Sequence, residues 1–130
     1  QMQYNMLLDF TRRVAQAQIP LDATSDIYKS IQYIKQRTNQ AITTSDVAAY
    51  VGKSRSYLSR RFKKELGFQM NEFIMRCKLE EAKSLLTYTD KSLSEISSYL
   101  CFSSQAYFQN VFKKKFGVTP NEYRKRPDVR

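Results

Sequence analysis

An internal repeat is the feature that most constrains how this chain can fold. The segments SYLSRRFKKELG (residues 56–67) and AYFQNVFKKKFG (residues 106–117) match at an offset of 50 residues. Just upstream the offset is 49, so the second copy contains one extra residue in the turn or in the first helical turn. The matched pairs are Val47 and Ile96, Tyr50 and Tyr99, Ser54 and Ser103, Tyr57 and Tyr107, Phe62 and Phe112, Lys63 and Lys113, Lys64 and Lys114, Gly67 and Gly117, Asn71 and Asn121, and Glu72 and Glu122. Two ordered copies with a connector indicate paired modules rather than a solenoid, which needs three or more repeats.

Each copy carries the start and stop signals of two short helices. In the first copy, Thr43 and Asp46 have the spacing of a capping box, and Gly52 ends the helix that follows. Ser54 is a candidate N-cap for the next helix, and Gly67 supplies its left-handed end. This stretch is therefore predicted to form a helix, a tight turn and a second helix.

The second copy repeats these signals. Ser92 with Glu95 gives the capping box, Ser103 or Ser104 gives the next cap, and Gly117 ends the second helix. A last short helix is predicted from Thr119, Pro120 and Glu122.

The pattern predicts an all-α fold with two helix-turn-helix subdomains joined by a long linker helix. The chain has only 3 Gly and 3 Pro, too few for a turn-dense all-β fold. A proline and cap-type residues at 19–25 predict a break, after which the next helix begins at Ser25 or Asp26. The predicted boundaries are residues 1–20 for a helix from an upstream linker or sensor region, 26–69 for the first subdomain, 70–89 for the linker helix and 90–127 for the second subdomain.

One stripe of each second helix is predicted to face the core. The inward residues are Leu58, Phe62 and Leu66 in the first copy and Tyr107, Phe108, Phe112 and Phe116 in the second. Arg61 aligns with Val111, which predicts a half-buried arginine with a structural role. Cys77 and Cys101 stand among apolar residues and are expected to be buried thiols in a reducing compartment. The sequence leaves a disulfide between Cys77 and Cys101 as an alternative.

The opposite stripe carries residue types that read base edges. Arginine pairs bidentately with guanine, glutamine and asparagine pair with adenine, and alanine contacts the methyl group of thymine. In helix-turn-helix docking, the N-terminal part of the second helix reaches the bases. The candidate base contacts are Arg55, Ser56, Ser59, Arg60, Gln105, Ala106, Gln109 and Asn110.

Lysines further along these helices, and serines at their starts, suit phosphates, which position a protein without specifying sequence. The candidate phosphate contacts are Ser54, Lys63, Lys64, Ser103, Ser104, Lys113 and Lys114. Taken singly, Arg60 is more often a solvated surface residue, and such lysines more often serve solubility. Their recurrence in one register in both copies favours contact with nucleic acid.

The charge balance favours a polyanion as partner, because 22 Lys+Arg stand against 12 Asp+Glu for a net charge of +10. The chain has no histidine, the commonest general base and metal ligand. With no phosphate-binding loop, metal-ligand cluster or paired acids, the sequence predicts a protein that is not an enzyme and holds no metal or cofactor. No apolar run is long enough to cross a bilayer, so no membrane association is expected. A module that binds RNA or an acidic protein is the alternative.

The repeated segments resemble a known family. SYLSRRFKKELG and FSSQAYFQNVFKKKFGVTPNEYR (residues 102–124) are similar to the two helix-turn-helix segments of AraC/XylS-type bacterial transcription regulators. FIMRCKLEEAKSLL (residues 73–86) resembles their linker helix, and the resemblance covers residues 26–124. In two departures, Cys101 stands where the family usually has glycine, which implies a slightly strained turn, and Met70 stands where it usually has proline.

The resemblance implies the C-terminal DNA-binding domain of such a regulator. It implies sequence-specific binding of double-stranded DNA at promoters, with two recognition helices in successive major grooves about 10 bp apart. It further implies activation through RNA polymerase, a location at the nucleoid in the bacterial cytoplasm, and an effector that binds a missing upstream domain. The first residue, Gln1 rather than Met, also leads us to expect a fragment of a longer protein.

Overall fold

Seven helices and no strand make up residues 21–125, the part of the chain that the computed structural model describes. They are α2 (Leu21–Lys35), α3 (Thr44–Val51), α4 (Arg55–Leu66), α5 (Met70–Tyr88), α6 (Leu93–Tyr99), α7 (Gln105–Phe116) and α8 (Pro120–Lys125). The predicted all-α fold is confirmed. The helix expected within residues 1–20 lies outside the described residues. None of the described helices is long and apolar enough to span a lipid bilayer.

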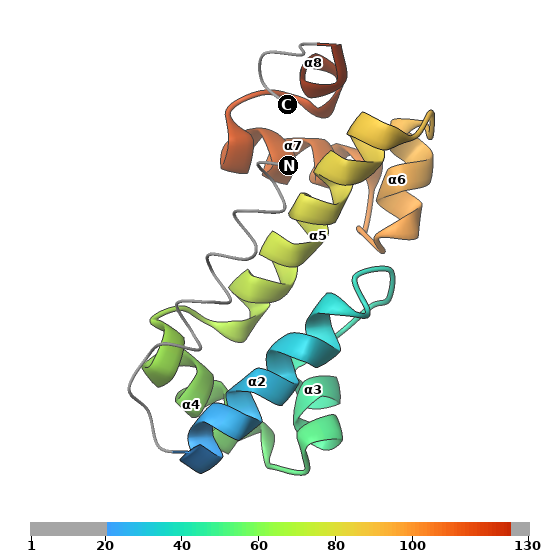
Figure 1. The fold of residues 1–130 in the computed structure, drawn as a ribbon. Helices are drawn as coiled ribbons and strands as arrows, with labels where there is room; N and C mark the ends of the chain where they lie inside the picture. Colours follow the sequence, from blue (N-terminus) through green and yellow to red (C-terminus); the bar gives the residue numbers. More distant parts are fainter. Residues whose placement is uncertain (1–20, 126–130) are drawn as a thin grey trace.

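The helices form two lobes on one long helix, α5 (Figure 1). Lobe one consists of α2, α3, α4 and the N-terminal half of α5, whereas lobe two consists of the C-terminal half of α5 with α6, α7 and α8. In the figure, α5 runs diagonally between α4 at one end and α7 at the other. Both predicted helix-turn-helix units, α3–α4 and α6–α7, are present.

Each lobe has its own hydrophobic core, and α5 contributes to both. The core of lobe one contains Ile27, Ile31, Ile34, Val47, Ala48, Leu58, Phe62, Met70, Phe73, Ile74 and Cys77. The core of lobe two contains Leu79, Ala82, Leu86, Leu93, Ile96, Leu100, Phe108, Phe112 and Tyr123. The predicted inward stripes of α4 and α7 are thus confirmed except at Tyr107, with Leu66 and Phe116 half-buried at their ends. Removal of these aromatic and aliphatic side chains from water is the main force that fixes the orientation of both helices.

The predicted helix starts are confirmed by reciprocal hydrogen bonds. The Asp46 amide donates to Thr43 Oγ1 at 3.1 Å, and the Thr43 amide donates to Asp46 Oδ2 at 2.9 Å. The same pair of bonds recurs at two further helix starts, Ser92 with Glu95 and Thr119 with Glu122. These bonds satisfy backbone N–H groups that have no partner within the helix.

Helix α2 begins earlier than predicted, at Leu21 rather than at Ser25 or Asp26. The break predicted for residues 19–25 is therefore wrong from Leu21 onward. Asp26 is buried and does not act as a cap. Its carboxylate pairs with Lys53 Nζ at 3.4 Å and accepts a hydrogen bond from Tyr57 Oη at 3.5 Å. Asp26 thus fastens α2 to the turn between α3 and α4.

The two cysteines differ, and the expectation that both are buried is wrong for Cys101. Cys77 is buried, and burial raises the pKa of its thiol to about 12. Cys101 is exposed, has a φ of +62°, and is free, as is Cys77. It ends the first helix of its unit as Gly52, with a φ of +83°, ends α3. Cys101 thus takes the left-handed position that ends a helix, outside the core of lobe two.

Tyr107 is also more exposed than predicted, with 44% of its surface accessible. It lies in the first turn of α7, where the ring of Phe102 contacts it with a centroid distance of 6.3 Å. The core position nearest to it is taken by Phe108, which is fully buried. Tyr107 therefore covers the edge of the core rather than filling it.

At positions 52 and 101, which both have a left-handed backbone, we expect the protein with glycine to be more stable than the protein with alanine by about 1 kcal/mol. The reason is that a Cβ at such a position strains the backbone. A Cβ added at Gly52 meets no atom within 4 Å, so Gly52→Ala tests strain alone. At the other turn, Cys101→Gly is compared with Cys101→Ala, since both variants lack the thiol. Urea unfolding measures the free energies, and equal stabilities of the two Cys101 variants would contradict the strain.

Candidate nucleic-acid interface

Helix α4 is held in place by its two ends and its inner face. The Tyr57 amide donates to Ser54 Oγ at 3.1 Å, which caps the start of the helix. Gly67, with a φ of +85°, ends it. Leu58 and Phe62 are fully buried on the inner face. Only the opposite face of α4 is therefore left for contact with a partner.

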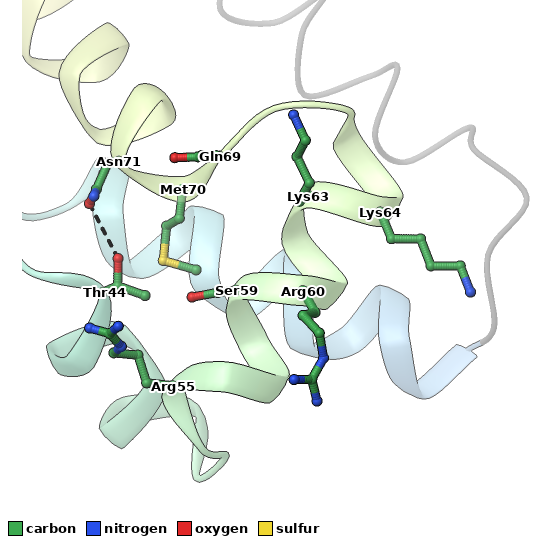
Figure 2. Close-up of a pocket in the computed structure, with 9 residues that line it drawn as sticks. All are labelled: Thr44, Arg55, Ser59, Arg60, Lys63, Lys64, Gln69, Met70 and Asn71. Atoms are coloured by element: carbon green, nitrogen blue, oxygen red, sulfur yellow. Dashed lines mark hydrogen bonds between the residues drawn. The ribbon is translucent and has the colours of Figure 1, made fainter.

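The outer face of α4 carries the four residues predicted to contact bases. Arg55, Ser56 and Arg60 are exposed, and Ser59 is half-buried. Figure 2 shows the Arg60 side chain extending away from the helix, and Arg55 near the start of α3. Two guanidinium groups therefore flank a strip of small hydroxyl side chains, a shape that lets a helix approach base edges closely.

A depression of about 500 Å³ lies beside this face and includes residues that the sequence reasoning missed. Its lining residues are Thr44, Arg55, Ser59, Arg60, Lys63, Lys64, Gln69, Met70 and Asn71 (Figure 2). Thr44 Oγ1 donates to Asn71 Oδ1 at 3.2 Å, which joins the start of α3 to the start of α5. Asn71 matches Asn121 in the repeat, and that match is the one sequence signal that could have found it.

Helix α7 presents a different outer face. Gln105, Ala106 and Asn110 are exposed and Gln109 is half-buried, so the face is neutral and rich in amide groups. Phe108 and Phe112 are fully buried on the inner side, as their counterparts are in α4. The structure thus brings the predicted base contacts together in two sets, one on α4 and one on α7, at the two ends of α5 (Figure 1).

The N-cap of α7 is Ser104, whose Oγ accepts a hydrogen bond from the Tyr107 amide at 3.0 Å. Ser104 is therefore the structural counterpart of Ser54, and the predicted match of Ser54 with Ser103 is wrong. The extra residue of the second copy lies in the turn between Cys101 and Ser104. Ser103 is exposed and lies beside the cap.

The lysines predicted to contact phosphate are all exposed and lie in the last turns of their helices. They are Lys63, Lys64, Lys113 and Lys114. Lysine at a helix C-terminus also interacts favourably with the helix dipole, so part of their role is structural. Arg61 differs from them because its guanidinium pairs with Glu65 at 2.8 Å, and its predicted half-buried, structural role is confirmed.

A second depression, of about 410 Å³, lies between α5 and α7. It is lined by Glu72, Met75, Arg76, Leu79, Val111, Lys114 and Lys115. Partial burial of its ammonium group lowers the pKa of Lys115, with Arg76 adding to the effect, and burial raises the pKa of Glu80 nearby. Lys114, one of the predicted phosphate contacts, lines this depression. Within residues 21–125, no group of three or more Cys, Asp or Glu residues is placed to hold a metal ion.

Comparison with known proteins explains this arrangement. A family profile described as a helix-turn-helix domain matches residues 47–126. The xylose operon regulatory protein of Escherichia coli (strain K12) is 41% identical over 98 residues, which are 75% of this chain and 25% of that protein. The chain belongs to the AraC-type helix-turn-helix family. The predicted role of DNA binding in transcription regulation is confirmed for this family domain, which spans a quarter of that relative's length.

Solved structures of AraC-type proteins share the fold. A transcriptional regulator from Chromobacterium violaceum with an AraC-type DNA-binding domain has a TM-score of 0.75 and 29% identity, covering 82% of this chain and 95% of that one. The xylose-binding transcription activator xylR has a TM-score of 0.72 and 40% identity, covering 78% of this chain and 27% of that one. The fold with two helix-turn-helix units is thus the fold of AraC-type DNA-binding domains.

The two neighbouring serines before α7 are expected to differ in their effect on stability. Ser104→Ala removes the cap and should lower the free energy of unfolding by about 1 kcal/mol. Ser103→Ala changes an exposed residue outside the cap and should change it by less than about 0.5 kcal/mol. Urea unfolding of both variants measures the difference. An equal loss in the two variants would show that Ser104 is not the cap.

Proposed function

We propose that the chain binds promoter DNA sequence-specifically, with α4 and α7 in successive major grooves. The observation that carries the proposal is that both helices bury the same stripe and expose the same opposite stripe. Base-reading residue types occupy that exposed stripe on each helix. A charged surface helix with no reading function has no reason to repeat this register in a second copy.

The outer face of α4 suits a half-site that contains guanine. Arg55 and Arg60 each carry a planar guanidinium group that can donate two parallel hydrogen bonds to guanine O6 and N7. Ser56 and Ser59 are small enough to let the helix lie deep in the groove. The exposure of both arginines at the edges of this strip supports the assignment.

The outer face of α7 suits a half-site that contains adenine and thymine. Gln105, Gln109 and Asn110 can pair bidentately with adenine, and Ala106 can contact a thymine methyl group. Because the two faces differ, the proposed DNA site is asymmetric within one chain.

The remaining contacts are proposed to be with phosphates, from Ser54, Lys63, Lys64, Ser103, Ser104, Lys113 and Lys114. Cap residues lie where a helix N-terminus can receive an anion, and lysines act as point charges along the backbone. The net charge of +10 supports this assignment.

The role of the whole protein is proposed from its relatives. One of them is a xylose-binding transcription activator, and this chain covers 27% of it. We propose that the protein activates transcription through contact with RNA polymerase at the bacterial nucleoid. An effector would bind a part of the protein other than this domain. The domain itself is proposed to have no enzymatic activity.

Selection from a random duplex library is the test of sequence-specific binding. We expect an enriched, asymmetric two-part motif with its halves about 10 bp apart. Affinity for the recovered duplex should fall by about a thousandfold between 50 and 200 mM salt, as expected for six or more phosphate contacts. A library without an enriched motif, together with equal binding of single-stranded RNA, would favour a general polyanion-binding module instead.

Two single substitutions separate base contacts from phosphate contacts. Arg60→Ala should cost about 1–3 kcal/mol on the selected duplex and relax the preference at one base pair, whereas Lys113→Ala should weaken all duplexes alike and reduce the salt slope by about 1. Binding titrations on the selected duplex and on base-substituted versions measure both effects. Lys29→Ala, which removes an exposed lysine of α2, serves as a control that loses charge without losing a proposed contact. A uniform loss for Arg60→Ala would place that arginine on the backbone.

A further inference from the structure

Lys78 is a buried cation at the boundary between the two lobes. It lies in the middle of α5, between Cys77 of the first core and Leu79 of the second, and it is 6% exposed. Burial lowers the pKa of its ammonium group. A buried charge is costly unless it is hydrogen-bonded, so its partners indicate what the contact holds together.

Three backbone carbonyl oxygens accept hydrogen bonds from the Lys78 ammonium. Two belong to the turn after α2, Thr38 O at 2.6 Å and Gln40 O at 2.7 Å. The third is Leu100 O, at 2.8 Å, at the C-terminal end of α6. An ammonium group has three donors, so one side chain satisfies all of them by contacting both lobes. Hydrogen bonds from a charged donor at these distances are among the stronger ones in proteins.

Helix packing holds each lobe together more than it joins the lobes to each other. The helix pairs with the most extensive contacts lie within one lobe or include α5. Figure 1 shows the turn after α2 extending toward α6. At this approach, Cys101 Sγ lies 3.5 Å from Asn39 O and donates a hydrogen bond to it. The two lobes have separate cores, so the polar contacts around Lys78 join them at a place where no hydrophobic core is shared.

We propose that Lys78 is a positioning residue that sets the distance and rotation between α4 and α7, and thereby the spacing of the two half-sites on DNA. The proposal rests on the proposed function. Helix α5 fixes how far apart the lobes lie along its axis, but contacts that reach both lobes are needed to resist their relative rotation. Lys78 provides three such contacts from one atom.

The energetic consequence appears only when both lobes bind one duplex. With the lobes braced, the second recognition helix meets its half-site at a high effective concentration once the first has bound. A looser joint lowers that effective concentration and tolerates more spacings. Binding of a single half-site does not depend on the joint.

The first measurement uses the unmodified chain and the duplex recovered from the random library. Inserting or deleting one base pair between the half-sites moves one by about 3.4 Å and rotates it by about 35°. We expect affinity to fall at least about tenfold for either change, since most of the gain from linking two sites is lost when geometry forbids joint binding. Equal affinity at all spacings would overturn the proposal without any variant.

The second measurement uses Lys78→Met, which keeps an unbranched side chain one atom shorter and removes its donors. We expect about tenfold weaker binding of the two-part duplex and less than about twofold change on duplexes with one half scrambled. The penalty for a one-base-pair shift should shrink. Lys29→Met, which removes an exposed lysine of α2, is the matched control and should keep the spacing profile.

Circular dichroism and urea unfolding establish first that Lys78→Met is folded. If it is not, Lys78→Arg keeps the charge and the donors on a longer side chain and should move or broaden the preferred spacing. An unchanged spacing profile in the folded variant, or an equal loss on half-sites and on the two-part duplex, overturns the role of Lys78. Absence of any binding to the selected half-sites by the unmodified chain would instead overturn the proposed function.

Discussion

The burial of one helix by two separate groups of helices is the constraint on which the rest of the domain depends. Helix α5 contributes Phe73 to one core and Leu86 to the other, so a single rigid rod carries both helix-turn-helix units. Each unit then packs its second helix by one apolar stripe. Because the core takes that stripe, the register of Phe62 and Phe112 determines which side chains of each helix remain exposed.

The helix ends and inward stripes of this domain were predictable because the interactions that set them are local. Caps such as Thr43 and Ser92 are recognised from residues three positions apart. The same capping pattern occurs in both copies of the repeat, which supported each assignment. The candidate reading faces followed by elimination. Contacts between distant segments were not predictable, because neither periodicity nor capping encodes them. The sequence placed a helix start at Ser25 or Asp26 but did not show that Asp26 pairs with Lys53, and no pattern in the sequence distinguished Lys78 from the other lysines.

The outer faces of α4 and α7 differ in charge. The reading face of α4 places Arg55 and Arg60 on either side of its serines, whereas that of α7 carries neutral amides. In the proposed binding mode, long-range attraction toward the duplex is therefore concentrated on lobe one and on the lysines at the helix ends. Lobe two would then contribute discrimination through hydrogen-bond geometry, which acts only at contact distance.

The separation of the two cores at Cys77 and Leu79 has a consequence for how such a domain changes during evolution. A substitution on the outer face of α7 disturbs no residue that packs in the other lobe. Under the proposed binding mode, one half of the recognised sequence could thus change while the other half is retained, and a promoter could acquire a new regulator by mutation of half its site. A fused core would couple the two halves and make each such step costly.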